Sequence, residues 1–156
     1  MKDQVAAGMT VLMADDDAED CMMTGKALAA SGGVESVRFV GDGEELMDYL
    51  MRRGEYRDPR SSPRPAIILL DLNMPRKGGY AALEEMKTHL EIRQIPVVVF
   101  TTSILEEDIR LSYDRGASSF IRKPETYQGL VEAMKGFREY WTEVATLPET
   151  ELGRGR

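Results

Sequence analysis

Residues able to bind a metal ion or a phosphate follow directly on several short apolar segments of the chain. They are Asp15, Asp16 and Asp17, then Asp71 and Asn73, then Thr101 and Thr102, and finally Lys123, which precedes Pro124. The set combines carboxylates with a hydroxyl and a cation, groups that can supply the positioning and charge neutralisation of phosphoryl transfer. A carboxylate can also act as the nucleophile in such chemistry and form an aspartyl phosphate.

Carboxylates gathered at one place repel one another. Two unit charges about 4 Å apart interact by about 4 kcal/mol at an effective dielectric near 20. Lys123 can offset one charge at most, so the three acids Asp15, Asp16 and Asp71 predict a divalent cation between them. Ligands that are all oxygen select a hard ion, Mg²⁺ or Mn²⁺. Mg²⁺ normally keeps several waters, which leaves room for a phosphoryl oxygen.

The segments that precede these residues are typical of strands in a parallel sheet. Short apolar segments predict strands at 11–14, 34–40, 66–70, 95–100 and 119–121. Apolar residues with helical periodicity predict helices at 18–31, 44–53, 80–90, 104–115 and 126–145. The alternation predicts an α/β fold, a doubly wound five-stranded parallel sheet with helices on both faces. Ligand sites in such sheets lie beyond the carboxyl ends of the strands, where strand order reverses.

Local signals predict several boundaries within one domain over residues 9–145, with short flexible termini at 1–8 and 146–156. Ser103 and Glu106 have the spacing of a capping box, which predicts a helix start there, and Asp42 with Glu45 is a weaker version of that signal. Gly116 is expected to end a helix in the left-handed conformation. Residues 54–65, rich in Pro, Ser and Arg, predict a surface loop.

Composition excludes several classes of protein. The net charge of −7 and the pI near 4.9 argue against a general nucleic-acid binder. A single cysteine, Cys21, excludes an internal disulfide framework and a cysteine-based zinc site, and a single histidine, His89, excludes a His-rich metal cage. There is no apolar run long enough to span a membrane and no signal-peptide pattern at the N-terminus, so we expect a cytoplasmic protein.

Four motifs in order, VLMADDD, ILLDLNMP, VVVFTTS and FIRKP, resemble the receiver domain of two-component response regulators over about residues 9–145. The resemblance implies the flavodoxin-like form of the predicted fold. It also implies that Asp71 is the phospho-acceptor for a sensor histidine kinase. Asp16 then matches the direct metal ligand, Asp15 an acidic neighbour acting largely through water, and the backbone carbonyl of Asn73 a further metal ligand.

The resemblance implies roles for the residues after the last two strands as well. Thr101 matches the switch hydroxyl that turns toward the new phosphoryl group, and Phe120 the switch aromatic that packs inward with it. Lys123 matches the lysine that bridges to the acceptor and then to the phosphate. The Lys123–Pro124 peptide bond would be cis.

The chain ends about 30 residues after Lys123, so we expect a stand-alone receiver without a DNA-binding output. The arginine-rich loop, TTS and REYWTEVATLP are similar to single-domain regulators paired with phytochrome-type kinases, which dimerise through the fourth helix, fifth strand and fifth helix. In the last helix, Leu130, Met134, Phe137, Trp141 and Val144 form a stripe that should cover the sheet. Tyr140 and Trp141 are candidate interface anchors, since aromatic residues often are.

The resulting hypothesis is a Mg²⁺-dependent signalling module that a sensor kinase phosphorylates on Asp71. Phosphorylation would change its surface or its dimerisation, and it would not be a turnover enzyme. The alternative is a metal-dependent phosphohydrolase of the haloacid-dehalogenase type, although there the second acid follows the nucleophile by two residues, where this chain has Asn73. A degenerate receiver serving as a scaffold is disfavoured because no site position is missing.

Overall fold

The computed structural model describes residues 9–148 and contains a five-stranded parallel sheet of order β2-β1-β3-β4-β5. The strands are β1 (Thr10–Ala14), β2 (Ser36–Val40), β3 (Ile67–Leu70), β4 (Val97–Thr101) and β5 (Ser119–Arg122). The helices are α2 (Ala18–Ser31), α3 (Gly43–Leu50), α4 (Gly79–Met86), α5 (Glu106–Asp114) and α6 (Tyr127–Glu139), with a short 3₁₀ helix η1 (Gly54–Tyr56) and a π-helical turn η2 (Tyr140–Val144). The predicted α/β fold is confirmed.

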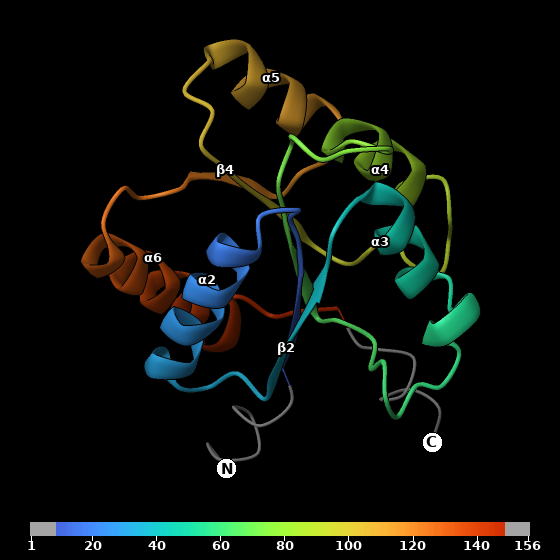
Figure 1. Cartoon of the computed structure of the whole chain (residues 1–156), viewed down its shortest axis with the longest axis horizontal. Helices are drawn as coiled ribbons and strands as arrows, with labels where there is room; N and C mark the ends of the chain where they lie inside the picture. Colours follow the sequence, from blue (N-terminus) through green and yellow to red (C-terminus); the bar gives the residue numbers. More distant parts are fainter. Residues whose placement is uncertain (1–8, 149–156) are drawn as a thin grey trace.

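The central strands are buried on both faces, because helices cover both (Figure 1). On one face Leu12, Ile68 and Val99 pack with the apolar side chains of α3 and α4. On the other face Met13, Leu69 and Val98 pack with those of α2 and α6. Neighbouring residues of one strand point to opposite faces, which is why these strands read as continuous apolar runs rather than alternating ones.

Two predicted helix starts have opposite outcomes. Asp42 caps α3, where its carboxylate accepts from the backbone N–H of Glu45 at 2.8 Å, and the Glu45 carboxylate accepts from the N–H of Gly41 at 2.7 Å. The Ser103 prediction is wrong, since α5 begins at Glu106 and its N-cap, Leu105, makes no side-chain capping bond. The Ser103 hydroxyl instead donates to the carboxylate of Asp108, 2.5 Å away, and accepts from the N–H of Leu105.

Helix α5 is the least buried of the helices that cover the sheet. Ser112 is its one buried residue, whereas Ile109 and Tyr113 are exposed by 38% and 48%. Its end is as predicted, because Gly116 follows it with φ of +106°. Few core contacts therefore hold α5, which lies at the edge of its layer beside α4 (Figure 1).

The last helix ends differently from the prediction. Leu130, Met134 and Phe137 are buried and Trp141 packs partly against the α2/α6 face, but Val144 is 71% exposed. The helix widens into the π turn η2 after Glu139, and this change of period carries Val144 out of the stripe.

The termini are described only in part. Of the residues expected to be flexible, 1–8 and 149–156 lie outside the described residues. Leu147 belongs to the same expectation but packs partly against the α2/α6 face. Among residues 9–148, no helix is both long and apolar enough to cross a membrane.

Candidate phosphoryl and metal site

Three carboxylates meet where strand order reverses, at the carboxyl ends of β1 and β3. Asp15 follows β1 directly and Asp71 follows β3, and with Asp16 each offers one oxygen such that all three lie within 4.8 Å of one another. Asp15 and Asp71 are buried, with 3% and 8% exposed, whereas Asp16 is exposed. The structure thus brings the predicted acids together, and their oxygen-only donor set fits a hard divalent cation.

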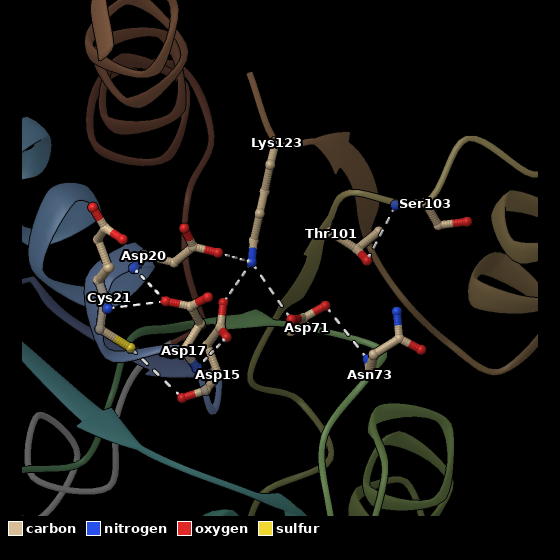
Figure 2. Close-up of polar contacts among 10 residues, drawn as sticks. Asp15, Asp17, Asp20, Cys21, Asp71, Asn73, Thr101, Ser103 and Lys123 are labelled. Carbon is tan, nitrogen blue, oxygen red and sulfur yellow. Dashed lines mark hydrogen bonds and ion pairs between the residues drawn. The ribbon is translucent and has the colours of Figure 1, made fainter. Parts of the chain in front are cut away.

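The ammonium of Lys123 lies among these carboxylates (Figure 2). Its Nζ is 2.6 Å from the nearest oxygen of Asp15, 2.8 Å from Asp20 and 3.4 Å from Asp71. Burial by itself lowers the pKa of Lys123, but the hydrogen bonds to Asp15 and Asp20 and the charge of Asp71 outweigh it and raise the pKa above its usual value. Lys123 therefore stays charged at neutral pH.

The strands place Lys123 through its own backbone. Its N–H donates to the carbonyl of Thr101 at 2.7 Å, which extends the pairing of β5 with β4 by one step. The predicted cis bond before Pro124 is wrong, because no peptide bond among residues 9–148 is cis. The trans form of an X–Pro bond is favoured by about 0.5–1 kcal/mol, and Lys123 reaches its three carboxylates without the cis form.

Asp20 is a site residue that the sequence analysis missed. It lies in the first turn of α2, where its own N–H donates to the capping carboxylate of Asp17 at 3.0 Å, and its side chain points to Lys123. The signal was present in the sequence, because Asp20 follows Asp16 by four residues at the start of a helix. The cation that Asp20 faces is Lys123 at the end of β5, 103 residues along the chain, so no local sequence pattern identifies it.

The turn after β1 fixes Asp15 and the start of α2. The N–H of Asp17 donates to the Asp15 carboxylate at 2.9 Å, while the Asp17 carboxylate caps α2. Burial raises the pKa of Asp15, and the hydrogen bonds from Lys123 and Asp17 only partly offset this. Cys21 is buried, its thiol contacts the Asp15 carbonyl at 3.6 Å, and burial together with the Asp15 charge raises its pKa to about 12.

The loop after β3 packs closely against Asp71. The N–H of Asn73 donates to the Asp71 carboxylate at 3.4 Å. A Cβ at Gly79, the first residue of α4, would lie 2.4 Å from the Asp71 carbonyl oxygen, so only glycine fits there. The helix that follows the loop therefore starts directly against the backbone of Asp71.

Thr101 is the last residue of β4, and Phe120 lies within the neighbouring strand β5, where it pairs with Val99. The Thr101 side chain is fully buried and its hydroxyl accepts from the N–H of Ser103 at 3.4 Å. Phe120 is partly buried and packs against the α3/α4 face. On the opposite side of the site, a pocket of about 490 Å³ opens beside Asp15 and Asp16, lined also by Met22 and Phe39.

Comparison with known proteins agrees with this geometry. Residues 11–135 match the family described as the response regulator receiver domain. The chain is 34% identical over 148 residues to the response regulator Rcp1 of Synechocystis sp., an alignment that covers 95% of this chain and 99% of that protein.

Solved structures are similar as well. The phosphorylated cyanobacterial phytochrome response regulator RcpA matches with a TM-score of 0.84 and 40% identity, over 92% of this chain and 100% of that chain. The Mn²⁺-bound form of Rcp1 matches with a TM-score of 0.80 and 33% identity, over 91% of this chain and 100% of that chain.

A parallel sheet with an acidic cluster and a lysine at its switch point defines a receiver fold, and this chain belongs to the response regulator receiver domain family. The predicted resemblance is confirmed. The phosphohydrolase alternative has no support, because the family match and the similar structures all point to receivers.

Proposed function

We propose that this chain accepts a phosphoryl group on Asp71 from a sensor histidine kinase and signals through the resulting change of its surface. The observation that carries the proposal is the gathering of Asp15, Asp16 and Asp71 within 4.8 Å, with the Lys123 ammonium contacting both buried acids. Such a cluster is costly unless positive charge neutralises it. A divalent cation bound by the carboxylates would neutralise the cluster and could also bind the oxygens of a phosphoryl group.

Phosphoryl transfer requires the protein mainly to position the reacting groups and to neutralise charge. A carboxylate oxygen of Asp71 attacks phosphorus, the new O–P bond forms as the P–N bond of the phosphohistidine breaks, and the electron pair stays on the imidazole nitrogen. Lys123 balances charge on the phosphoryl oxygens, and Thr101 can donate its hydroxyl to one of them. Mg²⁺ or Mn²⁺ held by Asp15, Asp16, Asp71 and the Asn73 carbonyl would supply further positive charge there.

The resting contacts of Thr101 suggest how the signal leaves the site. Its hydroxyl is engaged by Ser103, in the connection that leads to α5. A phosphoryl group on Asp71 adds about −1.5 to −2 charge at neutral pH and would accept a hydrogen bond from the O–H of Thr101, which only accepts in its contact with Ser103. Movement of Thr101 would then vacate space beside Phe120 and shift α5, which few core contacts hold.

The same element suggests the site of dimerisation. The family surface formed by the fourth helix, fifth strand and fifth helix corresponds here to α5, β5 and α6. On α5 the exposed Ile109 and Tyr113 are one turn apart, and beyond α6 Tyr140 is 50% exposed while Trp141 packs edge-on against it. We propose a second copy of this chain as the occupant of this surface, with Tyr140 as the more accessible of the two aromatic anchors.

The relatives suggest the kinase. Rcp1 and RcpA are response regulators, and RcpA is described as a phytochrome response regulator. We propose a phytochrome-type histidine kinase as the phosphodonor and the cytoplasm as the place of transfer. In this role the protein catalyses only its own phosphorylation and dephosphorylation and does not turn over an external substrate.

The test is incubation of the purified protein with acetyl phosphate and Mg²⁺, followed by intact mass. We expect one added phosphoryl group on the wild type, none on Asp71→Asn and none when EDTA replaces Mg²⁺. Equal phosphorylation of Asp71→Asn would contradict the assignment of the acceptor. Sustained turnover of a generic phosphate ester would contradict the signalling role and revive a phosphohydrolase.

A further inference from the structure

Lys123 has one partner more than the proposed chemistry requires. Its ammonium carries three N–H donors, and three carboxylates surround it, those of Asp15, Asp20 and Asp71. Asp20 stands outside the cluster of three acids that could hold a metal ion. Even so, its oxygen is 2.8 Å from Nζ, whereas that of Asp71 is 3.4 Å away.

We propose that Asp20 is a positioning residue that holds Lys123 toward α2 and so limits its contact with Asp71 and with the phosphoryl group. This rests on the proposed function, because it assigns Asp20 a role in the same reaction. The side chain of Lys123 is only 10% exposed, so its ammonium depends on carboxylates rather than on water. Asp20, with 40% of its side chain exposed, contacts the ammonium from α2, whereas Asp71 contacts it from the end of β3 (Figure 2).

A purely local role for Asp20 in helix stability does not account for this contact. An acid in the first turn of α2 interacts favourably with the helix dipole. Glu19 is also an acid in that turn, and it forms no ion pair with Lys123 within residues 9–148. The capping bond itself comes from Asp17. Glu19 therefore makes the same favourable interaction with the dipole of α2 as Asp20 does, but it does not contact Lys123.

Neutralising Asp20 should have two effects of opposite direction. One negative charge fewer beside Asp15, Asp16 and Asp71 weakens the attraction for a divalent cation. The same change frees Lys123 for Asp71 and makes the site less repulsive to an anionic phosphodonor. We therefore expect weaker metal binding together with faster phosphorylation once the metal is saturating, a pair of effects that a loss of helix stability does not produce.

The experiment compares Asp20→Asn with Glu19→Gln, which removes one charge from the same helical turn, and with Asp20→Glu, which keeps the charge. Mn²⁺ affinity is measured by calorimetry, and phosphorylation by acetyl phosphate is followed at saturating Mg²⁺. We expect Asp20→Asn to raise the Mn²⁺ Kd and the phosphorylation rate each about threefold or more. We expect Glu19→Gln to match the wild type and Asp20→Glu to restore most of both values.

A crystal structure of Asp20→Asn gives a direct readout, in which Nζ of Lys123 should move closer to Asp71 than the 3.4 Å of the wild type. An Asp20→Asn variant that behaves like Glu19→Gln, or that is phosphorylated more slowly, would overturn the proposal. Failure of the wild type to be phosphorylated would refute the proposed function instead. The Mn²⁺ affinity and the Lys123 position would still decide the role of Asp20.

Discussion

At the scale of single residues, the site is a balance between buried carboxylates and one buried ammonium. Asp15 and Asp71 are almost fully removed from water, and Lys123 contacts both. Removing one partner of such a group leaves an uncompensated buried charge. The lysine therefore stabilises the native site before any metal or phosphoryl group binds. The exposed Asp16 adds an acid that forms no ion pair within residues 9–148.

The excess of acids predicts stabilisation by metal. A ligand present at about 100 times its Kd and bound only by the native state adds about 2.7 kcal/mol to the free energy of unfolding, which raises Tm by about 5–10 °C in a domain of this size. We expect Mn²⁺ to raise the Tm of the wild type by this much, and Asp16→Asn to lose most of the shift. Differential scanning calorimetry measures the Tm of each protein with and without Mn²⁺.

Asp17→Asn is the matched control for this prediction. It is the same substitution one residue on, and Asn caps a helix as well as Asp does, so the α2 cap described above should be kept. A metal shift that survives in Asp16→Asn but disappears in Asp17→Asn would place the ion elsewhere.

At the scale of elements, side-chain partners decide where helices begin. Asp42 caps α3 and also forms an ion pair with Arg76 of the loop after β3, while its own side chain is only 6% exposed. Ser103 has the sequence of a capping residue but bonds Asp108 instead. Asp42 caps with one carboxylate oxygen and holds Arg76 with the other, whereas the single hydroxyl of Ser103 is engaged by Asp108 and Leu105.

This difference predicts unequal losses of stability. Asp42→Ala removes a cap, worth about 0.5–2 kcal/mol, and also leaves Arg76 without its carboxylate. We expect it to lower the free energy of unfolding by at least about 1 kcal/mol in urea denaturation. Ser103→Ala removes no cap, so its loss should be the smaller of the two, and the reverse order would contradict the assignment of α3 capping to Asp42.

At the scale of the whole molecule, the two faces of the sheet are unequally covered. Helices α2 and α6 pack against each other along one face, whereas α5 lies at the edge of the other with little of its surface buried (Figure 1). Apolar side chains that remain exposed on such an element are candidate contacts with another copy. The site and this surface are joined by the connection from Thr101 through Ser103 to α5.

The arrangement predicts dimerisation through α5. We expect phosphorylation to raise the dimer fraction of the wild type in sedimentation velocity, and Ile109→Glu to reduce it because a charge would enter the apolar contact. Leu90→Glu is the control, since Leu90 is 73% exposed and lies outside α5, β5 and α6. A dimer that is lost in Leu90→Glu and kept in Ile109→Glu would place the interface on another surface.

Local patterns in the sequence determined the sheet, most helix boundaries and the polar residues at the strand ends. These follow from short continuous apolar runs, from the 3.6-residue period of the helices and from the fact that parallel strands end at one edge. Five site residues could therefore be named, because each ends or follows a recognisable strand: Asp15, Asp16, Asp71, Thr101 and Lys123.

The tertiary structure alone decided which partners those residues take. It brought Asp20 into contact with Lys123 across 103 residues of chain and paired the Ser103 hydroxyl with Asp108. It also widened the last helix at Tyr140 and left the peptide bond before Pro124 trans. Each outcome depends on distances between side chains and on competition among neighbours brought together by folding. Periodicity along the chain contains no information on either.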